Sequence, residues 1–254
     1  MGSSKTGGAF HGAVGTGALL LLAEGAGRLG LIDPATVPPV SVVLVTAAGL
    51  LADPGFLAAA AATLAAWACG LAIAIGCAVP LGVVLGALPP AERALRPFLE
   101  FLRPVPAVAL IPPLLLLLRH DTAAKIGVVV YAATWPILIN TMYAIRDVDP
   151  QAKETLRGFG FGPLAVLRWV SLPSAAPFVL TGVRLAAAIG LIVVISAELL
   201  TGGATGVGVF LLAAGSAAGG TGVVLAVALW AGALGMTVNA LLVRAGRRLF
   251  RWHH

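Results

Sequence analysis

Two polar side chains interrupt long apolar stretches of the sequence and could contact a solute inside a membrane. Glu198 lies in the segment 195–200, and Asn140 lies in the segment 137–141. An ionisable group is costly within a lipid bilayer, so such a residue usually faces a solute path or pairs with another group. Glu198 is therefore a candidate for shaping the passage of an anion or for bonding to a neighbouring helix. Asn140 could line the same path or hydrogen-bond between helices.

A cluster of prolines interrupts a third apolar stretch. In the run Arg103-Pro104-Val105-Pro106, two residues lack the backbone N–H that a continuous helix requires. A broken membrane helix is tolerated where its backbone lines a cavity or is covered by protein. Arg103, Pro104 and Pro106 are therefore candidates for a translocation pathway or gate, and a purely structural kink is the alternative.

The residue types needed for catalysis do not occur in the patterns that enzymes use. The sequence contains no Gly-x-x-x-x-Gly-Lys motif, and none of its three lysines follows a glycine-rich turn: Lys5, Lys125 and Lys153. The four histidines lack metal-ligand spacing apart from the terminal pair, and no Ser or Cys lies in a nucleophile motif. The sequence thus predicts no enzyme, no metal site and no cofactor, and any ATP must be bound by a partner subunit.

The composition is that of an integral membrane protein. Of the 254 residues, 59% are hydrophobic and 10% are charged, with a mean hydropathy of +1.02, whereas a soluble domain carries about 25% charged residues. The net charge of +6 would suggest nucleic acid as the partner of a soluble protein, but in a membrane protein the positions of the charges matter more. We therefore expect an all-α chain in a lipid bilayer, with no nucleic acid partner.

Uncharged runs predict about six transmembrane helices, since a membrane helix needs about 20 mostly apolar residues. The predicted spans are residues 10–27, 57–88, 98–118, 124–145, 175–200 and 221–243. Residues 34–52 are interpreted as an interfacial helix rather than a seventh span, because prolines interrupt their start. The chain would then comprise an N-terminal part, residues 1–54, and a core domain, residues 55–251.

The distribution of Lys and Arg predicts which side of the membrane each loop faces. With six spans, both termini lie on one side together with residues 89–103 and 146–173. That side carries twelve Lys and Arg residues and the opposite side three, with Arg184 inside a span. Because cytoplasmic loops are enriched in Lys and Arg, both termini are predicted to lie in the cytoplasm.

The loop of residues 146–173 differs from the rest of the chain, since it holds seven of the 26 charges in 28 positions. Asp149 followed by Pro150 predicts the N-cap and first turn of a short helix that ends near Gly158. A cluster of glycines then stops this helix, and apolar residues from Leu164 onward start a second one. Two short helices at an angle would form a protruding knob, and an amphipathic loop on the lipid surface is the alternative.

The same loop resembles a known signature. Glu154, Gly160 and the pair Leu172-Pro173 have the spacing of the Glu-Ala-Ala, Gly, Ile-x-Leu-Pro signature in the permease subunits of bacterial ATP-binding-cassette importers. Other segments resemble the branch that serves aliphatic sulfonates, taurine and nitrate: residues 101–112, 135–136, 140–141, 146–150, 180–185 and 197–198. The resemblance implies that the chain couples to ATPase subunits through Asp149, Pro150, Glu154, Gly160, Leu172 and Pro173.

The resemblance also implies the fold and the partners. The fold would be that of a type I importer permease, with about six transmembrane helices and a cytoplasmic coupling helix. The partners would be two ATP-binding-cassette ATPase subunits, a second copy of the chain and an extracytoplasmic substrate-binding protein at the bacterial cytoplasmic membrane. The solute would be a small anion, with a neutral heterocycle as the alternative. A self-sufficient secondary transporter and a non-transporting scaffold are the other classes, and neither requires a stoichiometric ATPase.

Overall fold

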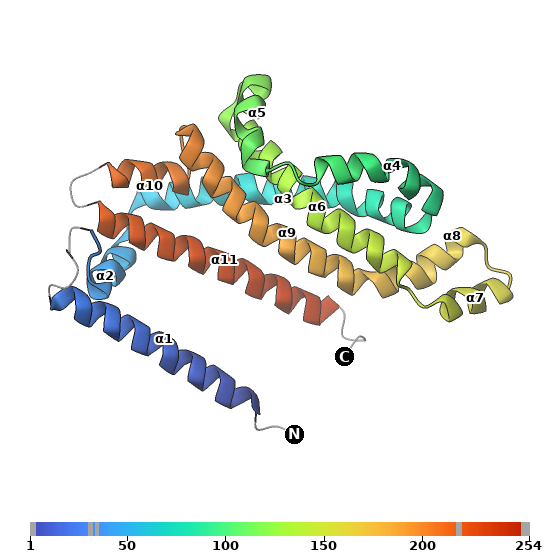
Figure 1. The fold of residues 1–254 in the computed structure, drawn as a ribbon, viewed down its shortest axis with the longest axis horizontal. Helices are drawn as coiled ribbons and strands as arrows, with labels where there is room; N and C mark the ends of the chain where they lie inside the picture. The colour runs from blue at the N-terminus through green and yellow to red at the C-terminus, as the bar shows by residue number, and fades with distance from the viewer. Residues whose placement is uncertain (1–3, 30–32, 34–35, 217–219, 250–254) are drawn as a thin grey trace.

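The computed structural model describes residues 4–29, 33, 36–216 and 220–249, and all regular structure in these residues is helical (Figure 1). The long helices are α1 (Ser4–Arg28), α3 (Pro54–Ala87), α6 (Asp121–Arg146), α9 (Leu172–Thr201) and α11 (Thr221–Leu249). The shorter helices are α2 (Val40–Leu50), α4 (Pro89–Leu102), α5 (Ile111–Leu118), α7 (Pro150–Gly158), α8 (Pro163–Val166) and α10 (Val207–Gly215). The predicted all-α fold is confirmed.

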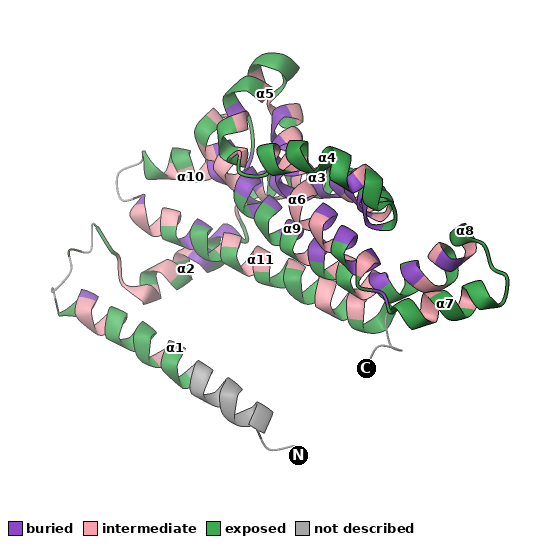
Figure 2. Cartoon of the chain, turned by 45° about the vertical axis from the view of Figure 1, so that its right-hand side comes forward, coloured by how far each residue is buried: buried purple, intermediate pink, exposed green. Residues whose placement is uncertain are grey.

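Helices α3, α6 and α9 form the core, and buried residues gather where they meet (Figure 2). Glycines bring α3 against α6. A Cβ built on Gly70 would lie 2.7 Å from the Cβ of Val129, and one built on Gly82 would lie 2.7 Å from the Cβ of Thr141. Because small residues allow helix backbones to approach closely, these helices pack as one unit.

Four helices are long and apolar enough to cross a membrane, namely α3, α6, α11 and the continuous helix Pro163–Thr201. They correspond to four of the six predicted spans. The predicted span over residues 98–118 is a bent pair of helices, since α4 and the helices that follow it meet at an angle of 83°. Pro104 and Pro106 lie in the turn between them, where their missing N–H groups prevent the helix from continuing. The predicted break is therefore confirmed, and it is sharper than a kink.

The first predicted span, residues 10–27, lies in α1, which stands apart from the bundle (Figure 1) and is not among the candidate spans. The crossing of the membrane by this helix therefore stays a prediction. Glu24 links α1 to α2 by accepting hydrogen bonds from Ser41, from the amide at 3.0 Å and from the hydroxyl at 2.7 Å. With 11 residues, α2 is about 16 Å long and too short to cross a core of about 30 Å.

The short helices α7 and α10 lie toward opposite ends of the long helices. Figure 1 shows the start of α1, the end of α11 and helix α7 all toward the same end, while α10 and the end of α9 lie at the other. The placement of both termini on the cytoplasmic side stays a prediction.

The second short helix predicted in that loop is not a separate element. Helix α8 continues through a π-helical turn, Leu167–Ser171, directly into α9, so that one helix runs from Pro163 to Thr201. Pro173 lacks the N–H that would otherwise bond to the carbonyl of Trp169, and a widened turn relieves the conflict. The structure therefore replaces two short helices with one short helix, α7, and the projecting start of a very long one.

Candidate functional site

Residues 149–171, called the knob below, begin with a capped helix. Asp149 Oδ1 accepts a hydrogen bond of 2.9 Å from the amide of Gln151, and Pro150 occupies the first helical position. The helix ends at Gly158, as predicted. Gly160 follows with a φ of +83°, and its amide bonds to the carbonyl of Arg157 at 2.9 Å. A residue with a side chain rarely adopts this backbone conformation, so the turn depends on glycine at position 160.

The knob is fixed to the core. Lys153 Nζ donates a hydrogen bond of 3.1 Å to the carbonyl of Ile145, the penultimate residue of α6. Val148, just after α6, is buried in a cluster with Ile145 and Ala175, and Leu167 packs against it. Because this cluster joins the end of α6 to the start of α9, a force on the knob is transmitted to both helices.

The surface of the knob carries large exposed apolar side chains on an otherwise polar segment. The exposed fraction is 77% for Phe159, 79% for Leu164 and 66% for Trp169. An exposed apolar surface of this kind marks a site of contact with protein or membrane. Glu154 is also exposed on α7, and Leu172 and Pro173 are exposed on the helix that leaves the knob. The six predicted coupling residues thus belong to one accessible projection and its attachment.

The proline-containing break is held by a side chain from α6. Tyr131 Oη donates to the carbonyl of Leu102 at 2.6 Å and lies 3.4 Å from that of Val105. Arg103, the first residue of the turn, lines a cavity of about 140 Å³ together with Trp135 and Arg146. Of the predicted gate residues, the structure places Arg103 in a cavity wall and the two prolines in the turn itself.

Glu198 is completely buried and lies at the centre of a hydrogen-bond network. Its two carboxylate oxygens accept bonds from Thr63 Oγ1 at 2.8 and 2.9 Å, and Oε2 accepts one from the amide of Gly208 at 3.0 Å. Lys125 Nζ lies 3.9 Å from Oε1. Of the two roles predicted for Glu198, bonding to neighbouring helices is the one the structure shows, because these contacts join α9 to α3, α6 and α10.

Three residues of this network, Thr63, Asp121 and Lys125, were missed by the sequence analysis. Lys125 Nζ pairs with Asp121 Oδ2 at 2.7 Å and donates to the carbonyl of Thr205 at 2.8 Å. The four-residue spacing of Asp121 and Lys125 at the start of α6 was the available signal. Thr63, Asp121, Lys125 and Glu198 are called the polar cluster below.

Glycines of the loop between α9 and α10 cover the polar cluster. Gly206 has a φ of +147°, and a Cβ built on it would overlap the carboxylate of Glu198. A Cβ built on Gly203 would overlap the carboxylate of Asp121 in the same way. The backbone therefore approaches both carboxylates more closely than a side chain would allow, and that of Glu198 is fully buried.

Asn140 does not hydrogen-bond to a neighbouring helix among the described residues, so that prediction is wrong. Its Nδ2 donates to the carbonyl of Pro136, one turn earlier in α6, at 2.8 Å. Instead it meets α9 by close packing, since a Cβ built on Gly182 would lie 2.7 Å from the Cβ of Asn140. Asn140 also lines a cavity of about 430 Å³ with Asp147 and Asp149, which keeps its role in a pathway open.

Residues 78–251 match the family described as binding-protein-dependent transport system inner membrane component. The chain belongs to this family. It is 31% identical over 190 residues to the nitrate import permease protein NrtB of Leptolyngbya laminosa, covering 75% of this chain and 67% of the relative. It is 30% identical over 235 residues to the taurine transport system permease protein TauC of Escherichia coli, covering 89% and 83%.

A third relative, the bicarbonate transport system permease protein CmpB of Synechococcus elongatus, is 29% identical over 199 residues, covering 78% of this chain and 71% of the relative. The matched region 78–251 begins within α3 and includes the knob, the break and all of the polar cluster except Thr63. The chain is thus an ABC transporter permease of the importer type, as the resemblance implied.

Within the described residues, no group of three or more His, Cys, Asp or Glu side chains could hold a metal ion.

Proposed function

We propose that this chain is the permease subunit of an ATP-driven importer that moves a small anion across the bacterial cytoplasmic membrane. The named relatives serve nitrate, taurine and bicarbonate, and all three are small solutes that carry a negatively charged group. The observation that carries the proposal is the knob, because a transport subunit without an ATPase partner does not need an exposed projection attached rigidly to its longest helices.

The continuous helix Pro163–Thr201 supplies the mechanical link. Its 39 residues extend over about 58 Å, from the knob to the polar cluster. An ATPase subunit that grips α7 and moves on ATP binding would tilt this helix and α6 together, since both are joined to the knob. Helix α5 packs against α6. The break at residues 103–106 would let α5 move together with α6 without moving α4.

The proposed function determines which partners the chain needs. Two ATPase subunits bind ATP and contact the knobs of two copies of this chain, and the pathway forms between those copies. Both termini and the knob face the cytoplasm. A substrate-binding protein delivers the solute at the opposite end, where Glu198 acts by holding α3, α6 and α9 together. Arg103, Pro104, Pro106 and Asn140 line the pathway on the cytoplasmic half.

Co-purification and reconstitution test the proposed function. The full chain, expressed with its co-encoded ATPase and binding protein, should purify with the ATPase in equal numbers, and the binding protein loaded with its anion should stimulate ATP hydrolysis in liposomes. Uptake by the chain alone would contradict the proposal, and so would hydrolysis that does not respond to the loaded binding protein. Stimulation by a neutral heterocycle but by no anion would overturn the assignment of the solute only.

A further inference from the structure

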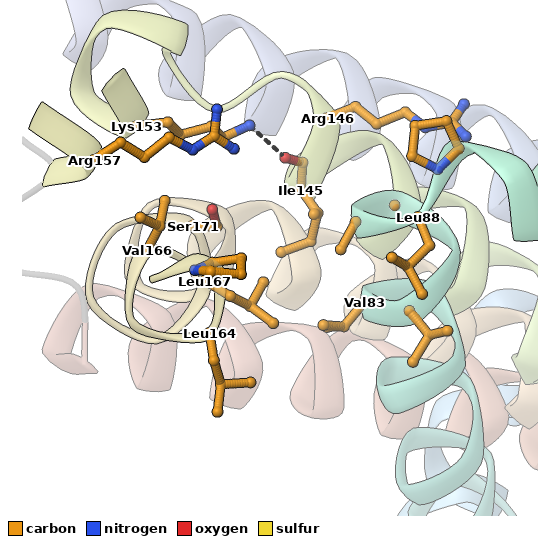
Figure 3. Close-up of a pocket in the computed structure, with 15 residues that line it drawn as sticks. Val83, Leu88, Ile145, Arg146, Lys153, Arg157, Leu164, Val166, Leu167 and Ser171 are labelled. Atoms are coloured by element: carbon orange, nitrogen blue, oxygen red, sulfur yellow. Dashed lines mark hydrogen bonds between the residues drawn. The ribbon is translucent and has the colours of Figure 1, made fainter. Parts of the chain in front are cut away.

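A cavity of about 650 Å³ lies between the knob and the end of α3. Its walls come from the end of α3, the end of α6, α7, and the segment from Pro163 to Ser171. Figure 3 shows the side chains of Arg157, Lys153 and Arg146 along one side of the cavity and those of Leu164, Leu167 and Val83 across from them. This volume lies within the range of small-molecule sites.

The charged groups that line the cavity are all positive. They are Arg146, Lys153 and Arg157, and no carboxylate lines it among the described residues. Arg146 is partly balanced by Glu92, whose Oε2 lies 3.2 Å from Nη2. Lys153 donates to a neutral carbonyl, and Arg157 has no ion-pair partner in the described part of the chain. The cavity therefore has a net positive charge that an anion would complement.

The remaining lining is apolar. Val83, Val84, Leu164 and Leu167 contribute aliphatic side chains to the same cavity. The cavity also lies at the level where α3 ends at Ala87 and α6 ends at Arg146. A simple inorganic anion would use only the cations, whereas a molecule with an anionic head and an apolar tail would contact both parts.

We propose that this cavity binds an anionic phospholipid of the inner leaflet, with the phosphate against Arg157 and Lys153 and the upper acyl chains against Val84 and Leu167. Basic pockets between membrane helices on the cytoplasmic side bind anionic lipid headgroups. The lipid would bridge α3 and α7, so the membrane composition would influence the position of the knob. This inference needs no ATPase and can fail or succeed independently of the proposed function.

The test uses the full chain purified in a neutral detergent, with phosphatidylglycerol and phosphatidylcholine added separately and bound lipid counted by native mass spectrometry. Phosphatidylglycerol should bind more tightly, and Arg157→Gln should weaken its binding about fivefold, the effect expected for one basic group near a lipid phosphate. Arg168→Gln is the matched control, because Arg168 lies on the same projection outside the cavity, over the ring of Trp169. It should change binding by less than about twofold.

A second variant tests the cavity without changing its charge. Ala87→Phe places a large side chain in the cavity wall and should also displace phosphatidylglycerol, with the net charge unchanged. Equal binding of the two lipids, or unchanged binding in both variants, would overturn the proposal. Displacement of the lipid by millimolar inorganic phosphate would show a simple anion site instead. The Arg157→Gln complex could also lose its ATPase while lipid binding stays intact. That result would assign these cations to the ATPase interface and would refute the lipid proposal.

Discussion

The two ends of the helix Pro163–Thr201 are built in opposite ways. At the knob, the side chains of Phe159, Leu164 and Trp169 are exposed, and the shape depends on a single backbone conformation at Gly160. At the polar cluster, Thr63, Lys125 and Glu198 are buried and interact across helices. The difference indicates a contact surface at one end and a fixed joint at the other. Substitutions at the joint should therefore reduce stability, and substitutions at the knob should reduce coupling.

Removing the cation from the polar cluster should have the largest effect on stability. Lys125→Met leaves the buried carboxylate of Glu198 and the partly exposed one of Asp121 close together without a positive partner, and a buried pair that loses one member costs about 3–5 kcal/mol. Thermal unfolding of the purified chain in detergent measures this loss. Arg93→Met removes an exposed cation on α4 and should change the unfolding free energy by less than about 0.5 kcal/mol. Equal effects of the two variants would show that the buried pairing is unimportant.

Removing the hydroxyl of Thr63 should have a smaller effect at the same joint. Thr63 Oγ1 donates to Glu198 and accepts from the amide of Val207 at 2.9 Å. Thr63→Val has nearly the same shape but leaves both groups without this partner, which should cost about 1–3 kcal/mol. Thr63→Ser keeps the hydroxyl and should recover most of the lost stability in the same unfolding measurement. A Ser variant as unstable as the Val variant would point to packing rather than hydrogen bonding.

The cap of α7 should give the smallest loss of stability. Asp149→Ala removes the acceptor for the amide of Gln151 and should destabilise this short helix by about 1 kcal/mol. Because α7 is exposed, local hydrogen exchange in residues 150–158 should rise while the global unfolding temperature changes little. Asp149→Asn retains a capping oxygen and should behave like the wild type. A global unfolding shift as large as that of Thr63→Val would contradict the contrast between the two ends.

Local signals in the sequence predicted the knob well and the polar cluster poorly. The cap at Asp149, the end of α7 and the need for glycine at position 160 depend on neighbouring residues, and the structure has all three. The polar cluster joins Thr63 to Glu198 across 135 positions, and no local pattern indicates which helix faces will meet. The hydrogen bond predicted between Asn140 and a neighbouring helix was wrong for the same reason. The side-chain amide of Asn140 donates to a carbonyl of its own helix instead.

The geometric effect of two proline-containing segments could not be derived from the sequence. The break near residues 103–106 was predicted from its prolines, but the bend of 83° between α4 and the following helices was not. The second helix of the knob was inferred from the glycine cluster and the apolar residues from Leu164 onward, yet it continues into α9 because a π-helical turn accommodates Pro173. In both cases the proline was noticed, but its geometric consequence could be determined only from the packing around it.

We propose that the knob couples the chain to an ATPase through the shape set at Gly160. The direct test compares Gly160→Val with Gly158→Val in the complete complex, because both glycines have open space around them and only Gly160 has a positive φ. The backbone strain at position 160, about 1–2 kcal/mol, should reduce ATPase retention about tenfold and lower substrate-stimulated hydrolysis, whereas Gly158→Val should retain both. Glu154→Ala should weaken the same contact without altering the turn. Wild-type retention and hydrolysis in both Gly160→Val and Glu154→Ala would contradict the account.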